Sequence, residues 1–128
     1  MTIEQFFKAY AREFEMGNTQ ALVEYYSEPS MDMCGDATTV LQSQQDISDY
    51  LQQIIQQCTA MGMAKLSAKM QTQMSLADDI TFCVVRWTLE SADGATLMVT
   101  PTSYTLKCKQ GEPCKIIASV REQLGVQA

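Results

Sequence analysis

Apolar side chains recur at helical spacing in the first part of the chain. The stretch from Ile3 to Phe14 repeats them every three or four residues, after a capping-box start at Thr2 and before a stop at Gly17. Asn18 can cap a second, shorter helix, which we expect to carry Leu22, Val23 and Tyr26 inward and to end at Pro29.

A third helix is predicted from residue 43 to about residue 58. Ser43 and Asp46 form its capping pair, and its apolar stripe consists of Ile47, Tyr50, Leu51, Ile54, Ile55 and Cys58. Between the second and third helices, residues 30–34 and 38–42 read as two short strands around the turn Gly35-Asp36.

From residue 64 onward the period changes to two, which is typical of strands with one dry face. Strands are predicted over 64–76, 80–91, 96–109 and 115–122, and Pro101 indicates a bulge or an edge position. Helices placed before an antiparallel meander predict an α+β domain, in which three N-terminal helices pack on a curved antiparallel sheet.

Length and composition narrow the function. The 128 residues are expected to form a single domain, 1–128, and the net charge of −6 argues against a nucleic-acid partner. There is no histidine, which excludes histidine-based nucleophilic catalysis and histidine-ligated metal sites. The sequence contains no apolar stretch long enough for a membrane span and no signal-peptide pattern at its start, so a cytoplasmic protein is expected.

The cysteines give no metal-binding signature. Their number is odd and they lack paired C-x-x-C spacing, so we expect reduced thiols, no metal and no cofactor. The five positions are Cys34, Cys58, Cys83, Cys108 and Cys114.

The order of elements resembles the NTF2-like superfamily, which includes SnoaL-like and ketosteroid-isomerase-like domains. The resemblance rests on AYAREFEMGNTQALVEYYSEPSMDMC near the start, SQQDISDYL at the third helix and VVRWTLESADG in the sheet. It implies a cone-shaped fold, cystatin-like in its α+β arrangement, with a pocket between the concave sheet and the helices. It also implies frequent dimers, and a family that contains both enzymes and non-catalytic binding proteins.

The resemblance transfers only part of a catalytic set. Tyr10 stands seven residues before Gly17, as does the hydrogen-bonding tyrosine of ketosteroid isomerases. The position of the family's general base is occupied by Cys34, and that of its second acid falls near Ser103. The dehydratase branch uses histidine, which this chain lacks. A clear catalytic set is therefore not expected.

Two choices of strand face remain open. Either Asp32 and Cys34 point into the pocket, where a desolvated Asp32 could serve as a base, or Met31 and Met33 fill it. On the fourth predicted strand, apolarity favours an inward Trp87, whereas the family-style alignment favours an inward Arg86. An inward Arg86 would bind a carboxylate or pair with Asp32.

Three functions follow as hypotheses. The first is a homodimer, formed through the sheet, that binds a small apolar molecule in the cone. The second is an isomerase or hydratase with Asp32 as base and Tyr10 as donor. The third is a protein-interaction module whose cone is filled by its own side chains, and a cavity below roughly 300 Å³ would favour it. The expected pocket residues are Tyr10, Phe14, Asp32, Cys34, Tyr50, Ile54, Met70, Met74, Arg86, Trp87 and Ser103.

Overall fold

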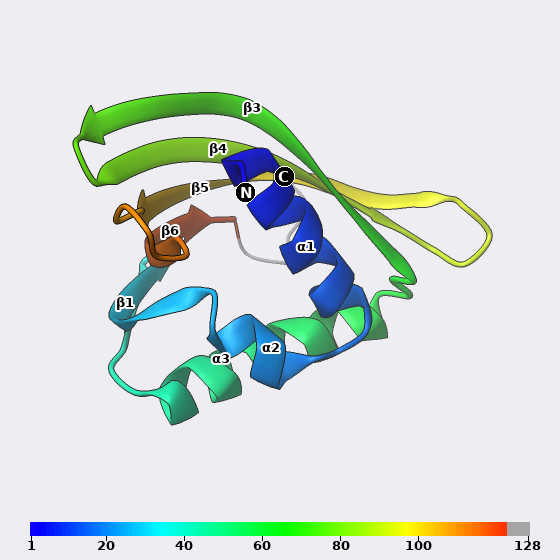
Figure 1. The fold of residues 1–128 in the computed structure, drawn as a ribbon. Helices are drawn as coiled ribbons and strands as arrows, with labels where there is room; N and C mark the ends of the chain where they lie inside the picture. The colour runs from blue at the N-terminus through cyan, green and yellow to red at the C-terminus, as the bar shows by residue number, and fades with distance from the viewer. Residues whose placement is uncertain (123–128) are drawn as a thin grey trace.

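A computed structural model describes residues 1–122 and shows helices packed against one face of a single sheet (Figure 1). The helices are α1 (Ile3–Glu15), α2 (Thr19–Val23) and α3 (Gln44–Ala60). The strands are β1 (Tyr26–Cys34), β2 (Ala37–Leu41), β3 (Lys65–Ala77), β4 (Ile80–Glu90), β5 (Thr96–Lys107) and β6 (Lys115–Arg121).

The six strands form one mixed sheet in the order β2-β1-β6-β5-β4-β3. The strands from β3 to β6 form the predicted antiparallel meander, and β1 and β2 form the predicted hairpin. The expectation of a purely antiparallel sheet is wrong, because β1 lies parallel to β6. Alternation along a strand identifies its dry face, but it does not give the direction of a neighbour that is distant in sequence.

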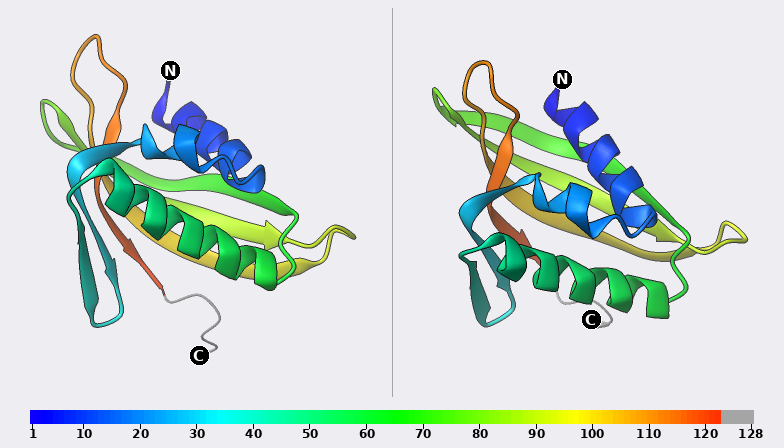
Figure 2. Two further views of the ribbon diagram at one scale, coloured as in Figure 1. Left: turned by 90° about the horizontal axis from the view of Figure 1, so that it is seen from below. Right: turned by 60° about the horizontal axis from the view of Figure 1, so that its bottom comes forward.

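The sheet curves around the helices, and both α1 and α3 lie on its concave face (Figures 1 and 2). Thr2 forms the predicted capping box with Gln5, and Ser43 caps α3 by accepting from the Asp46 backbone. Ile47 and Leu51 on α3 are fully buried, as are Val85 on β4 and Leu106 on β5. Each such side chain contributes roughly 1.5–3 kcal/mol by leaving water. The core therefore lies between the helices and the concave face.

The second helix is shorter than the sequence pattern predicted. It ends at Val23, and Pro29 lies within β1, where the Glu28–Pro29 peptide bond is cis. A residue before proline is restricted to extended conformations, so Glu28 belongs in a strand rather than in a helix. Asn18 makes no capping hydrogen bond, and its side chain instead donates to Glu13 Oε2 at 2.7 Å.

A bulge at Gln71 changes which face the end of β3 presents. Met70 pairs with the buried Val85, but the next pair joins Thr72 to Val84, so the alternation inverts between them. Met74 consequently lies opposite Phe82 on the convex face and is 52% exposed. The single continuous dry face predicted for residues 64–76 is therefore wrong beyond Met70.

Pro101 occupies an edge-like position within β5, as predicted. It pairs with Arg86 of β4, whereas the pairing of β5 with β6 begins at Thr102. Proline has no backbone N–H to donate, so it fits where the strand has a neighbour on one side only.

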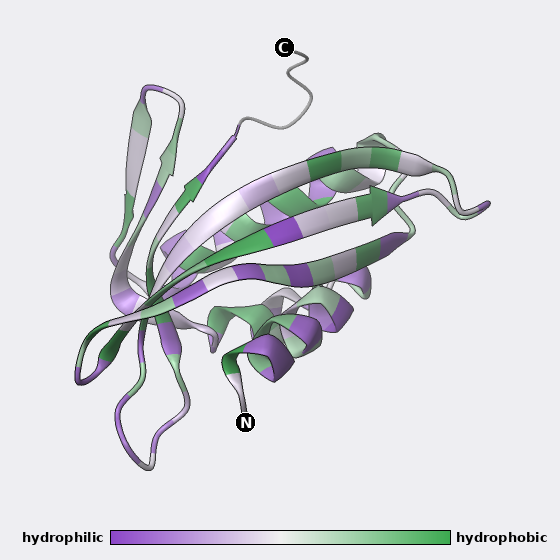
Figure 3. Cartoon of the chain, turned by 90° about the horizontal axis from the view of Figure 1, so that it is seen from above, coloured by the Kyte–Doolittle hydropathy of each residue, from purple (hydrophilic) through white to green (hydrophobic). Residues whose placement is uncertain are grey.

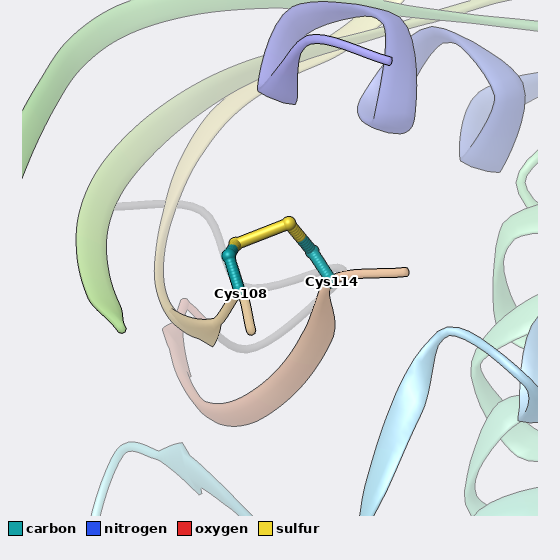
Figure 4. Close-up of a disulfide and its surroundings, with 2 residues drawn as sticks. All are labelled: Cys108 and Cys114. Atoms are coloured by element: carbon teal, nitrogen blue, oxygen red, sulfur yellow. A yellow bond between two sulfur atoms is a disulfide. The ribbon is translucent and has the colours of Figure 1, made fainter. Parts of the chain in front are cut away.

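None of the helices within residues 1–122 is long and apolar enough to cross a membrane. The expectation that all five cysteines are reduced is wrong. Cys108 and Cys114 form a disulfide across the loop between β5 and β6 (Figure 4). Cys108 directly follows β5 and Cys114 directly precedes β6, so the hairpin holds the two cysteines together across the loop. Cys34, Cys58 and Cys83 are free.

Quantitation of thiols under denaturing, non-reducing conditions tests the disulfide. We expect three reactive thiols in the native-sequence protein, and five after reduction. The variant Cys108→Ser should give four before reduction, because it releases Cys114. Five thiols in the unreduced native sequence would show that the loop is not crosslinked.

Candidate functional site

Aromatic side chains fill most of the space inside the cone. Phe7 and Tyr10 enter from α1, Tyr26 from β1, Trp87 from β4 and Tyr104 from β5. The ring centroids of Phe7 and Tyr104 lie 4.6 Å apart, and those of Tyr10 and Trp87 lie 5.8 Å apart. Such separations are typical of tilted and edge-to-face aromatic packing. The cone is thus largely closed by its own rings.

A small cavity remains beside these rings. Its volume is about 70 Å³, below the ~300 Å³ usual for a ligand pocket, and a cavity of this size favours the hypothesis of an interaction module over that of a large hollow. The exposed Glu122 and the partly exposed Arg121 contribute to its wall, so the cavity reaches the surface at the end of β6. Its other lining residues are Tyr10, Phe14, Tyr26, Tyr50, Ile54, Cys58, Leu66, Trp87, Leu89, Thr100, Thr102, Tyr104 and Ser119.

Two phenols share a hydrogen bond at the wall of this cavity. The hydroxyl oxygens of Tyr10 and Tyr26 lie 2.6 Å apart, and the two side chains are 5% and 6% exposed. One of the two phenolic protons lies in this bond. Within residues 1–122, the other has no acceptor in the hydrogen-bond network. A buried donor without a partner costs about 1–3 kcal/mol, so this proton needs an acceptor in the cavity.

The phenol of Tyr104 also has a buried proton without an acceptor among the described residues. Tyr104 accepts a hydrogen bond from Nε1 of Trp87 at 3.1 Å, and among the described residues its own proton has no acceptor. The hydroxyl of Thr100, also at the cavity wall, is buried without any partner in the described part of the chain. The cavity is therefore apolar in its walls but carries several hydroxyl groups ready to bond.

Asp32 forms the centre of a separate polar cluster. It is 2% exposed, and its Oδ1 accepts from the hydroxyls of Tyr50 at 2.9 Å and Ser119 at 2.8 Å. Nε of Arg121 donates to both carboxylate oxygens, at 3.3 and 3.2 Å. Because the charge of Asp32 is paired and its oxygens accept several donors, burial of this carboxylate is tolerated.

The structure decides both choices of strand face. Asp32 and its neighbours on alternate positions of β1 point inward, whereas Met31 lies on the opposite face and is 38% exposed. On β4, Trp87 is buried and Arg86 is exposed, as the apolar alternation indicated. The family-style alignment, which placed Arg86 inward, is wrong.

A second hollow lies between the β1–β2 hairpin and α3. This open groove has a volume of about 710 Å³, and Asp32 and Cys34 line it, together with the acidic Asp36, Asp46 and Asp49. Tyr10 lines only the cavity and Asp32 only the groove. The structure therefore does not bring the predicted base and the predicted donor to one hollow. Tyr50, Ile54 and Arg121 line both.

The remaining predicted pocket residues divide clearly. Phe14, Tyr50, Ile54 and Trp87 line the cavity with Tyr10. Met70, Met74, Arg86 and Ser103 line neither the cavity nor the groove. Ser103 pairs with Val84 and so faces away from the helices, while its neighbour Tyr104 pairs with the buried Cys83.

Several residues of the site were not predicted. The sequence pattern places Tyr26 at the end of a helix, whereas it lies in β1, and the family resemblance indicates Ser103, one position from Tyr104. Ser119 and Arg121 alternate on β6 and carried a signal that could have been read, since strand alternation places them on one face. The cation expected from Arg86 is supplied by Arg121.

Burial raises the pKa of the interior phenols. Removal from water is the main cause for Tyr10, Tyr26, Tyr50 and Tyr104, because a phenolate would be poorly solvated there. The nearby Asp32 carboxylate raises the pKa of Tyr10 and Tyr50 further. Burial also raises the pKa of the Cys58 thiol to about 11. At neutral pH these phenols are therefore donors, and the Cys58 thiol is protonated.

These shifts predict a loss of stability at alkaline pH. In the unfolded chain the phenols ionise near pH 10, whereas in the folded protein they keep their protons, so folding binds protons above pH 10. Each such phenol should lower the free energy of unfolding by about 1.4 kcal/mol per pH unit. We expect the absorbance change at phenolate wavelengths to coincide with unfolding measured by circular dichroism. Reversible ionisation of these four tyrosines near pH 10 in the folded protein would contradict the burial.

The comparisons with known proteins agree with this architecture. Residues 1–123 match a family described as NTF2-like protein (DUF6841). A comparison with curated proteins gave no match. Among solved structures, an NTF-2-like protein of unknown function from Shewanella oneidensis is similar, with a TM-score of 0.73 and 14% identity over 94% of this chain and 96% of that one.

Two other structures show the same fold at low identity. A domain of unknown function with a cystatin-like fold from Nostoc punctiforme has a TM-score of 0.73 and 15% identity, covering 97% of this chain and 76% of that one. A ketosteroid isomerase-like protein from Erwinia carotovora atroseptica has a TM-score of 0.66 and 12% identity, covering 97% of this chain and 95% of that one. The fold and the match along nearly the whole sequence show that the chain belongs to the NTF2-like family DUF6841.

Proposed function

We propose that the protein binds a small, largely apolar molecule in the cone cavity. An oxygen atom of that molecule accepts a hydrogen bond from the phenols. The observation that carries this proposal is the shared hydrogen bond of Tyr10 and Tyr26, which leaves one buried phenolic proton without an acceptor among the described residues. Tyr104 supplies a second such proton at the same cavity.

The size of the cavity limits what can enter. A volume of about 70 Å³ admits a narrow chain or the end of a larger molecule, but not a fused-ring ligand, unless side chains move. The walls between the hydroxyl groups are apolar, including Phe14, Ile54, Leu66 and Leu89. A short hydrocarbon that ends in an oxygen acceptor meets both requirements.

The same geometry favours binding over proton transfer. A general base must reach the proton that it removes, directly or through one water molecule. Asp32 already accepts hydrogen bonds from Tyr50, Ser119 and Arg121, and it does not line the cavity beside Tyr10. The isomerase or hydratase hypothesis is therefore disfavoured, because its base, Asp32, is held by other side chains away from the donor, Tyr10.

Occupation of the cavity can be followed with its own tryptophan. Trp87 is the sole tryptophan of the chain and lines the cavity, so its fluorescence should respond to short aliphatic alcohols and ketones. The variant Ile54→Phe should weaken this response about tenfold or more, because the larger side chain occupies the cavity wall near the surface. Its matched control is Ile55→Phe, on the same helix but outside the cavity lining.

The hydrogen-bonding part of the proposal needs its own variant. The double variant Tyr10→Phe with Tyr26→Phe removes both hydroxyls of the pair, and with them the unpartnered proton, and it should weaken binding of a ketone more than binding of the corresponding alkane. Equal responses of native protein, Ile54→Phe and Ile55→Phe would place the binding site elsewhere. No fluorescence response to any of these molecules would reject the proposal.

The convex face supports a second proposal, self-association through the sheet. Four of its strands each place an exposed apolar side chain on this face: Met31, Met74, Val99 and Val120. Figure 3 views this face of the sheet, with the helices behind it. Single exposed apolar residues are common, but a set on one face is typical of interfaces. We therefore propose a homodimer in which two sheets pack on each other.

Molar mass in solution tests the dimer. We expect light scattering to give twice the chain mass of 14.3 kDa at micromolar concentration. The variant Val120→Lys, which places a charge on the convex face, should give the monomer mass. Met16→Lys, at an exposed apolar residue after α1, is the control and should remain dimeric. A monomeric native protein, or a dimeric Val120→Lys variant, would argue against this interface.

A further inference from the structure

Arg121 lies where the cavity and the groove meet. It lines both hollows, and its side chain is 20% exposed. Its hydrogen bonds to the described residues leave from Nε, which donates to the two oxygens of Asp32. The hydroxyl of Tyr50 also lies within hydrogen-bonding reach of this guanidinium. Among residues 1–122, Asp32 is the one anionic partner of this guanidinium.

The orientation of this guanidinium is fixed by its surroundings. Asp32 holds Nε, and the ring of Tyr50 lies 5.7 Å from the guanidinium carbon, a cation–π distance. Tyr50 and Ser119 in turn hold Asp32 by hydrogen bonds. A guanidinium restrained at one edge presents its two terminal nitrogens as a fork, and that fork matches the geometry of a carboxylate.

The groove carries charges that would oppose an anion. Asp36, Asp46 and Asp49 line it and are exposed. Two of these carboxylates already act locally on α3, since Asp46 accepts from the backbone of Gln42 and Asp49 accepts from the side chain of Gln45. Exposed charges are screened by salt, with a Debye length of about 8 Å at physiological ionic strength. A direct, partly buried contact with Arg121 is screened far less.

We propose that Arg121 binds the carboxylate of a short aliphatic carboxylic acid whose hydrocarbon chain enters the cavity. This inference rests on the proposed function, because the cavity must accept the chain. The apolar walls and the guanidinium at the opening together select such a molecule over a neutral one of the same length. The phenols at the inner wall then meet either water or a further oxygen atom of the ligand.

The test compares three molecules with the same hydrocarbon chain. Pentanoate, pentanamide and pentylamine are titrated against the full chain, with Trp87 fluorescence as the readout. We expect pentanoate to bind about tenfold tighter than pentanamide, because a hydrogen bond to a charged group is worth about 1.5–3 kcal/mol. Pentylamine should bind weakest, because it places a cation beside the guanidinium.

Two variants assign the preference to this residue. Arg121→Lys keeps the charge beside Asp32 but loses the fork, and it should lose most of the preference for pentanoate. The double variant Asp32→Asn with Arg121→Gln removes both charges together, which avoids leaving Asp32 buried and unpaired. It should bind pentanoate no better than pentanamide. Arg86→Gln, at an exposed arginine on the convex face, is the matched control and should keep the preference.

Each outcome decides the inference. Equal affinity of the native protein for pentanoate and pentanamide, or tighter binding of pentylamine, would overturn the carboxylate site while leaving the cavity as a binding site. A preference for pentanoate that survives in both Arg121 variants would place the anion elsewhere. Absence of binding by all three molecules would overturn this inference, whereas the proposed function is decided separately by the alcohols and ketones, which can carry an oxygen to the phenols.

Discussion

The interior of this protein depends on one requirement, that hydroxyl groups buried with aromatic rings must find hydrogen-bond partners. Tyr10, Tyr26, Tyr50 and Tyr104 bring four phenols into the space between helices and sheet. Tyr50 satisfies its hydroxyl on Asp32, and Tyr10 and Tyr26 share theirs. Because donors exceed acceptors around the cavity, the packing that closes the cone also leaves a site with unmet hydrogen bonds.

The polar cluster around Asp32 has a structural role beside any functional one. It joins β1, β6 and α3, because Asp32, Ser119, Arg121 and Tyr50 come from these three elements. The parallel pairing of β1 with β6 places Asp32 directly opposite Ser119. A buried carboxylate held in this way fixes how the hairpin sits on the sheet. It also turns Arg121 toward the opening of the cavity.

Much of the fold could be predicted from the sequence, because it depends on local patterns. The capping box at Thr2, the Ser43 cap and the period of two after residue 64 each act over a few residues. The errors arose where distant parts of the chain decide the outcome. The bulge at Gln71 and the parallel β1–β6 pair depend on neighbours that alternation does not reveal. The Cys108–Cys114 disulfide is local and depends instead on the hairpin that brings its two ends together. The same holds for the site: Tyr10 and Trp87 follow from local patterns, whereas the contact of Arg121 with Asp32 depends on the pairing of β6 with β1, a strand distant in the sequence.

The central claim is that the cavity beside Tyr10, Tyr26 and Tyr104 holds a hydrogen-bond acceptor. An experimental electron-density map at high resolution tests it most directly. We expect density for an ordered water or a bound molecule within about 2.6–3.2 Å of a phenolic oxygen of Tyr10, Tyr26 or Tyr104. A cavity without such density, or phenols whose protons are bonded to backbone carbonyls instead, would contradict it.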